Sequence, residues 1–245
     1  MRTVISQPMY FPWCGLINQI ILCDIYVNYD DVQLSRGFYN RVQVKRPNGV
    51  KFITVPIKNK RQKLLIRDAE ISYEVQWINN HRTVLEESFK HCAYKSDALD
   101  IFDKVHEKKF KYLSDLSFES ILAILKYLGL YEGRKYINSS VLKLDGKGGR
   151  RLLDITKNIG GRIYITGHGA FNYLDHTLFE ENGIEVRYMN YGIAHYEQSH
   201  GSFTPFVTSL DAIAHLGPNA ARLFKSSTIN WQSIKNKDDL IRVII

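Results

Sequence analysis

Apolar and polar positions along the chain predict a mixture of strands and helices. Residues 2–7 form a short β-branched run, residues 14–24 carry apolar side chains at helical spacing, and residues 25–33 form a second apolar run. A strand, a helix and a second strand in this order normally form a parallel, right-handed unit. The carboxyl ends of the two strands then meet at one edge of a sheet, which is where open α/β sheets bind ligands.

The rest of the chain continues this pattern around a helical stretch. Residues 39–57 are expected to form a hairpin around a turn at "RPNG", in which Asn48-Gly49 is a two-residue turn signal. Residues 75–132 are expected to form a helical subdomain. A second β-α-β unit is expected over residues 162–191, after a helix at 148–160. The prediction is one α/β domain over 1–245, with a parallel or mixed Rossmann-like sheet and a helical insertion between two β-α-β units. The tail is expected to be loosely ordered from about Lys225.

Composition restricts the possible partners. The chain has 245 residues and a formal charge of +8, from 33 Lys and Arg against 25 Asp and Glu. The basic residues are scattered, which favours a solvated basic surface first, a positive cleft for a diphosphate second and nucleic acid third. No apolar run is long enough to cross a membrane, and no signal peptide is recognised. The three cysteines, Cys14, Cys23 and Cys92, lack zinc-site spacing and indicate reduced thiols in the cytoplasm.

The first candidate residues lie just after the first strand, in "SQPMYFPW". Tyr10, Phe11 and Trp13 are crowded together beside Gln7, although a plain surface turn uses Gly, Asn or Asp. These rings must be covered by the protein core or by a ligand. We expect Gln7, Tyr10 and Trp13 to help form the floor of a ligand cleft.

Asp30 and Asp31 follow the second strand and are candidate general bases. Neighbouring strand residues point to opposite faces, so one carboxylate is expected to be functional and the other to cap a turn. A solvated turn pair is the alternative. Gln33, Asn40 and Arg41 come next; Arg41 could bind a phosphate bidentately or form a surface salt bridge.

"TGHGAFNY" has the form of a turn that cradles phosphate at a helix start. Its Gly167 and Tyr173 are candidate binding residues, and His168 is either an acid or base or a satisfied turn histidine. Tyr196 and Gln198 belong to a later aromatic and polar loop. Asp211 opens a helix, where capping is the first interpretation and substrate binding the second.

Several stretches together resemble the WbqC-like family. The resemblance covers nearly the whole chain and rests on Trp77 and on "ISQPMYFPWCG", "YVNYDDVQLSRGFYNRVQVK", "ITVPI", "YITGHGAFNYLD", "LFEENGIEV" and "HYEQSHGSFTPFVTSLDAIAHLG". The resemblance implies a protein encoded among genes for cell-surface polysaccharide, notably O-antigen. Transfer of glycine or another acyl group to a sugar is one suggested activity.

The hypothesis is therefore a cytoplasmic transferase that attaches an acyl or aminoacyl group to a nucleotide-linked amino sugar. Asp30, Asp31 or His168 would take the proton from the amine, Tyr10 and Trp13 would stack on base or sugar, and Arg41 with the Gly167 turn would meet phosphate. No cofactor or bound metal is expected, and the acyl donor's carrier stays open, with tRNA as one possibility. The alternatives are a glycosyltransferase and a protein that binds a sugar nucleotide without chemistry.

Overall fold

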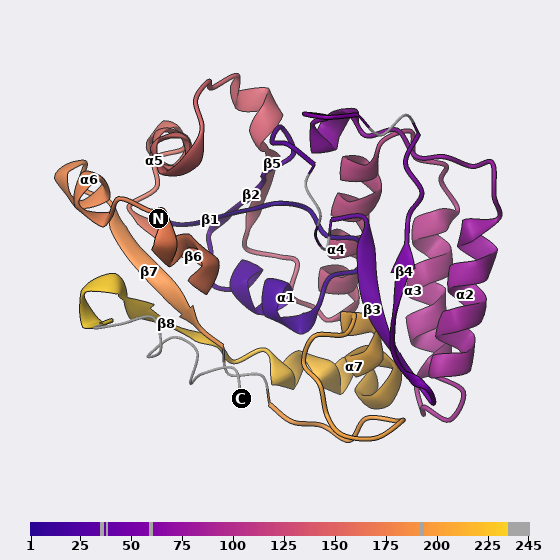
Figure 1. The fold of residues 1–245 in the computed structure, drawn as a ribbon. Helices are drawn as coiled ribbons and strands as arrows, with labels where there is room; N and C mark the ends of the chain where they lie inside the picture. Colours follow the sequence, from indigo (N-terminus) through magenta and orange to yellow (C-terminus); the bar gives the residue numbers. More distant parts are fainter. Residues whose placement is uncertain (35–36, 38, 59–60, 192–193, 235–245) are drawn as a thin grey trace.

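The computed structural model describes residues 1–34, 37, 39–58, 61–191 and 194–234. Its centre is a six-stranded sheet in the order β5-β2-β1-β6-β7-β8 (Figure 1). All neighbouring strands are parallel except β7 and β8, which are antiparallel. This mixed, mostly parallel sheet confirms the predicted α/β class. The strands are β1 (Arg2–Ser6), β2 (Ile25–Asn28), β5 (Lys135–Asn138), β6 (Ile163–Thr166), β7 (Glu185–Asn190) and β8 (Ser227–Asn230).

The strand order reverses beside β1. The chain runs outward from β1 through β2 to β5, then returns to the other side of β1 as β6 and continues to β7 and β8. Val4 of β1 therefore pairs with Tyr26 of β2 on one side and with Ile165 of β6 on the other. In doubly wound sheets, such a reversal leaves a crevice at the carboxyl ends of the two diverging strands.

Helices cover both faces of this sheet. Val4 and Ile5 point to opposite faces because side chains alternate along a strand. Val4 belongs to the core cluster that includes helix α1 (Cys14–Ile20), whereas Ile5 belongs to a second cluster with helices α5 (Gly148–Asn158) and α6 (His176–Glu181). Burial on both faces explains why β1 and β2 are almost continuously apolar.

The remaining elements gather at one end of the sheet (Figure 1). A separate hairpin lies beside four helices, and their side chains share one core cluster with α1. Three of these helices fall within the predicted helical stretch 75–132. The elements are β3 (Arg41–Arg46), β4 (Gly49–Thr54), α2 (Trp77–Ser88), α3 (Lys95–His106), α4 (Leu113–Tyr127) and α7 (Ser209–Leu216).

Three local predictions need correction. The predicted turn over "RPNG" is present, but its two central residues are Pro47-Asn48 and not Asn48-Gly49, since Arg46 pairs with Gly49, whose φ is +98°. The edge strand β5 was not predicted, because its Lys135 and Asn138 break the apolar pattern. The tail is ordered beyond Lys225, since β8 pairs with β7 and a short 3-10 helix, η5 (Trp231–Ser233), follows it. Residues 235–245 lie outside the described residues.

Candidate functional site

A cavity of about 370 Å³ opens at the carboxyl ends of β1 and β6. Its walls include Ser6 and Gln7 from the end of β1, Tyr29 just after β2, and Thr166 and Gly167 from the end of β6. This is the point where the strand order reverses. The cavity therefore occupies the position at which doubly wound α/β folds bind their ligands.

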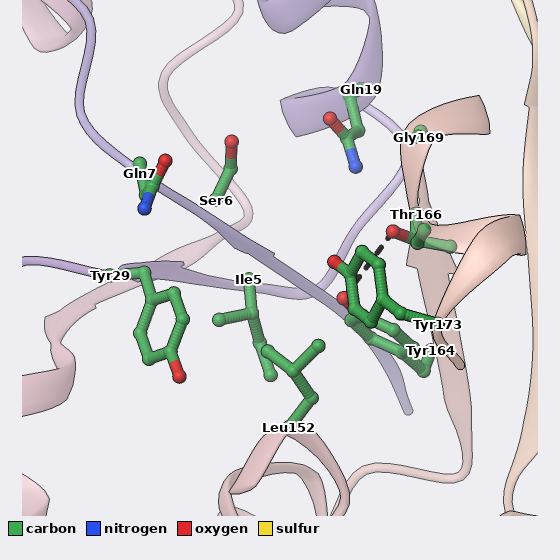
Figure 2. A pocket seen from close by; sticks show the side chains of 12 residues that line it. Ile5, Ser6, Gln7, Gln19, Tyr29, Leu152, Tyr164, Thr166, Gly169 and Tyr173 are labelled. Carbon is green, nitrogen blue, oxygen red and sulfur yellow. Dashed lines mark hydrogen bonds between the residues drawn. The ribbon is translucent and has the colours of Figure 1, made fainter. Parts of the chain in front are cut away.

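The cavity has an aromatic and aliphatic interior. Figure 2 shows Tyr29 on one side and Tyr164 with Tyr173 on the other, with Ile5 and Leu152 between them. Tyr164 is buried, whereas Tyr173 is 58% exposed and stands at the mouth. Flat rings and aliphatic side chains suit the faces of a nucleoside base or a sugar ring.

Neutral hydrogen-bonding groups complete the lining. The Tyr164 hydroxyl donates to Thr166 Oγ1 at 3.3 Å, and Gln19 Nε2 donates to the Ile165 carbonyl at 3.2 Å. Burial raises the pKa of Tyr29, so its hydroxyl stays protonated at neutral pH. Within the described part of the chain, no charged side chain lines this cavity.

The turn after β6 brings His168 next to the cavity wall. A Cβ at Gly167 would lie 3.1 Å from the hydroxyl of Tyr191, which is tighter than an ordinary contact. His168 begins the 3-10 helix η3 (His168–Asn172), and its Nε2 lies 2.6 Å from the Met189 carbonyl. Because a carbonyl only accepts, Nε2 carries the proton and Nδ1 carries the lone pair. Nδ1 is buried and has no hydrogen-bond partner among the described residues. Burial lowers the pKa of His168, so the ring is neutral at neutral pH.

The Asp30 carboxylate caps the start of a short helix. Asp30 is 3% exposed, and its carboxylate accepts hydrogen bonds from the Ser139 hydroxyl at 3.0 Å, the Ser140 amide at 2.9 Å and the Ser140 hydroxyl at 2.7 Å. These donors begin the 3-10 helix η2 (Ser139–Leu142) after β5. Asp30 therefore ties the end of β2 to the end of β5 and does not line the cavity.

Asp31 is held by an arginine that sequence reasoning missed. Arg151 of α5 forms an ion pair with Asp31 at 2.5 Å, and the two side chains are 7% and 9% exposed. Ser139 also donates to Asp31. The sequence did contain a signal: Arg151 precedes Ile155 by four positions, so it lies on the buried face of its helix and needs a partner.

The predicted residues Gln33, Asn40 and Arg41 lie apart from the cavity lining. Gln33 is exposed and forms an isolated bridge with Leu65. Asn40 donates from Nδ2 to the Val55 carbonyl at 2.9 Å, which closes the open end of the hairpin. Arg41 donates from Nε to the Gly37 carbonyl at 3.0 Å, and its guanidinium carbon lies 4.3 Å from the centre of the Phe52 ring. The structure thus places Arg41 on the hairpin.

The aromatic residues of the opening stretch divide between two environments. Tyr10 is fully buried among helices, with its hydroxyl 3.2 Å from both His81 Nδ1 and His106 Nε2. Tyr10 belongs to the core and does not line the cavity. Trp13 is half-buried and packs against Tyr191, with ring centres 5.5 Å apart, beyond the Gly167 wall of the cavity.

A buried polar network near the start of α7 contains Tyr196, Gln198 and Asp211. The Tyr196 hydroxyl donates to Asp211 Oδ2 at 2.7 Å, and Gln198 Nε2 donates to the Tyr196 oxygen at 2.9 Å. Lys45, which is 4% exposed, donates to Gln198 Oε1 at 3.1 Å and to two loop carbonyls. Burial raises the pKa of Asp211. The structure brings these residues together as a clamp on the loop before α7, and does not bring them to the cavity.

Of the predicted residues, Gln7, Gly167 and Tyr173 line the cavity, and His168 adjoins it. Ser6 and Thr166 lie inside the candidate stretches "SQPMYFPW" and "TGHGAFNY", and Tyr29 directly precedes Asp30, but none of the three was named as a binding residue. Ser6, Tyr29 and Thr166 are the polar or aromatic residues that end or follow the parallel strands. The described residues contain no cluster of three or more His, Cys, Asp or Glu suited to a metal ion. No helix in the described part is long and apolar enough to span a membrane.

Comparison with known proteins identifies the family. The model of the WbqC-like protein family matches residues 7–223. The chain belongs to this family. A Mycobacterium tuberculosis protein described as uncharacterized protein Rv1507c is 31% identical over 224 residues, which cover 89% of this chain and 95% of that protein. The WbqC-like chain also aligns with the crystal structure of CmiS6 at 12% identity and a TM-score of 0.17, over 77% of this chain and 57% of that one. A TM-score this low carries no argument about fold.

Proposed function

We propose that this WbqC-like protein is a transferase that attaches an acyl or aminoacyl group, such as glycine, to a nucleotide-linked amino sugar for O-antigen or other cell-surface polysaccharide. The position and lining of the cavity carry the proposal. It lies at the switch point between β1 and β6, and it combines tyrosine rings with neutral hydrogen-bonding groups. The proposal places the reaction in the cytoplasm.

His168 is the base that best fits amide formation. The ammonium group of the amino sugar first loses one proton to solvent; the free amine then attacks the acyl carbonyl, the base takes the proton that the nitrogen loses as the C–N bond forms, and the bond to the donor's leaving group breaks. His168 offers a neutral ring with an unoccupied Nδ1 lone pair. For Nδ1 to reach the amine, the Gly167–Gly169 turn must change conformation so that the His168 ring faces the cavity. Asp30 and Asp31 are less suited, since both carboxylates already have several partners.

Turnover by purified protein tests the proposal. Nucleotide-linked amino sugars are incubated with acyl thioesters, with aminoacyl-tRNA or with an amino acid and ATP, and an added acyl mass is sought on the sugar. In His168→Gln, kcat should fall by about a hundredfold or more while KM changes little, because a general base acts in the transition state. Asp30→Asn serves as the comparison: a larger kcat loss there, with His168→Gln active, contradicts the assignment of the base.

Two alternatives have distinct outcomes in the same assay. A glycosyltransferase would release the nucleotide from a neutral nucleotide sugar and would depend on Mn²⁺ or Mg²⁺. A binding protein without chemistry would bind the nucleotide sugar and show no turnover with any donor. Either outcome contradicts acyl transfer while leaving the cavity as the ligand site.

A further inference from the structure

A second cavity of about 430 Å³ lies next to the first and carries charged groups. Arg67, Lys143 and Arg151 line it, and they come from three separate segments of the chain. Arg67 belongs to the 3-10 helix η1 (Ile66–Asp68), Lys143 follows η2 and Arg151 lies in the first turn of α5. Two carboxylates, Asp31 and Asp145, line the same cavity, so its cations exceed its acidic groups by one, and an excess of positive side chains around a hollow favours an anion.

The two cavities are neighbours through α5 and the end of β2. Leu152 lines the first cavity and Arg151 lines the second, while Tyr29 lines the first and Asp31 the second. The guanidinium carbon of Arg151 lies 5.2 Å from the ring centre of Tyr29. A single extended ligand could therefore place a ring against Tyr29 and an anionic group beside Arg151.

Arg151 is fixed in place rather than free on the surface. Its side chain is 7% exposed, Asp31 holds its guanidinium, and its Nε has no hydrogen-bond partner among the described residues. Arg67 and Lys143 are more exposed; the side chain of Arg67 is 43% exposed. Arg67 and Lys143 can thus reach a ligand without first breaking a buried ion pair.

The start of helix α5 lies beside this cavity, between the lining residues Gly146 and Arg151. Helix α5 starts at Gly148, and its N-cap residue Lys147 makes no side-chain hydrogen bond to the helix. The first N–H groups of an α-helix have no partner inside the helix, and their dipoles favour negative charge. Gly146, with φ of +105°, lines the cavity just before this helix start.

We propose that the second cavity binds the diphosphate of a nucleotide-linked sugar, while the nucleoside base or the sugar ring of the same molecule lies in the first cavity. This inference rests on the proposed function for the identity of the whole ligand. The residues expected to contact phosphate are therefore Arg67, Lys143 and the start of α5. They replace Arg41 and the Gly167 turn. Two carboxylates also line the cavity: Asp31 is engaged by Arg151, and Asp145 is exposed.

Calorimetric titration of inorganic pyrophosphate into the full chain, at low ionic strength, tests the anion site alone. The test variant is Arg67→Ala/Lys143→Ala, and the charge-matched control is Arg222→Ala/Lys225→Ala, which removes two exposed cations that line neither cavity. Each lost charge-assisted hydrogen bond is expected to weaken binding by about tenfold or more. The control should stay within about threefold of wild type. Equal weakening in both variants, or no pyrophosphate binding by wild type, overturns the proposal.

A parallel titration with UDP-linked amino sugar separates this inference from the proposed function. If the sugar nucleotide binds and the test variant weakens it as it weakens pyrophosphate, both stand. If it binds and the test variant leaves it unchanged, the diphosphate site is overturned and the proposed function remains. If pyrophosphate binding depends on Arg67 and Lys143 while no nucleotide sugar binds, the anion site stands and the proposed substrate is wrong. Thermal melts without ligand check that each variant folds.

Discussion

The guanidinium of Arg151 lies over the ring of Tyr29, with 5.2 Å between the guanidinium carbon and the ring centre. Tyr29 follows β2 and faces the uncharged cavity, whereas Arg151 belongs to α5 and faces the charged one. This contact joins the cavity proposed for a ring to the cavity proposed for an anion. A nucleotide-linked sugar combines both kinds of group in one molecule.

Loss of the Asp31 carboxylate should destabilise the fold. Asp31→Asn leaves the Arg151 guanidinium buried without its counter-charge, and breaking one side of a buried ion pair typically costs about 3 kcal/mol or more. Urea unfolding measures the change. Asp154→Asn is the control, because Asp154 pairs with Arg150 on the surface, where such pairs contribute about 1 kcal/mol or less. Equal losses of unfolding free energy in the two variants would show that the buried pair stabilises the fold no more than the surface pair does.

Acidification should weaken the fold through His81. Burial, helped by the neighbouring His106, lowers the pKa of His81 to about 4, against 6.5 for an ordinary histidine. Between these values the unfolded chain binds more protons than the folded one, so the free energy of unfolding falls as pH falls from about 6.5 to about 4. The shift corresponds to roughly 3 kcal/mol over that window. Above pH 6.5 this group contributes no pH dependence.

Urea unfolding at pH 7 and pH 5 measures this effect in wild type and in His81→Gln, which cannot take up the proton. The variant should lose less stability on acidification. Some pH dependence should remain, since burial also lowers the pKa of His106. The same loss in both proteins would show that His81 does not titrate in this window.

The three cysteines should differ sharply in reactivity. Cys14 and Cys23 are buried, and burial raises the pKa of each thiol to about 12, which keeps both as unreactive thiols. Cys92 is partly exposed, and its Sγ lies 3.4 Å from His215 Nε2. Ellman's reagent should therefore label one thiol quickly in the folded protein and all three in urea. A fast phase that persists in Cys92→Ser would contradict this prediction.

Sequence reasoning reached the fold because local patterns and sheet rules agreed. The apolar runs around residues 2–28 predicted β1, α1 and β2, and the rule for β-α-β units made the two strands parallel. It missed β5 and misjudged the segment around β8 because edge strands are short and half-exposed, which weakens their apolar pattern.

The site was predicted only in part, because a pattern shows which residues need cover but not what covers them. The crowded rings of Tyr10 and Trp13 suggested a ligand, but helices α2 and α3 cover Tyr10. Asp30 and Asp31 were placed at the correct sheet edge, yet their partners Ser139 and Arg151 come from more than a hundred residues later in the chain. Such long-range pairings cannot be seen in local periodicity.

The most direct measurement is the affinity of a nucleotide-linked amino sugar for wild type, Gly169→Ala and Gly169→Phe. Gly169 lines the first cavity, its φ is not in the left-handed region, and a Cβ there would meet no atom within 4 Å. Both variants should therefore fold, and only the phenylalanine is large enough to take up part of the cavity of about 370 Å³. We predict that Gly169→Ala binds within about threefold of wild type and that Gly169→Phe loses binding by about a hundredfold, as expected when a well-fitted ligand is excluded. Equal affinity in all three proteins would contradict the assignment of this cavity as the substrate site.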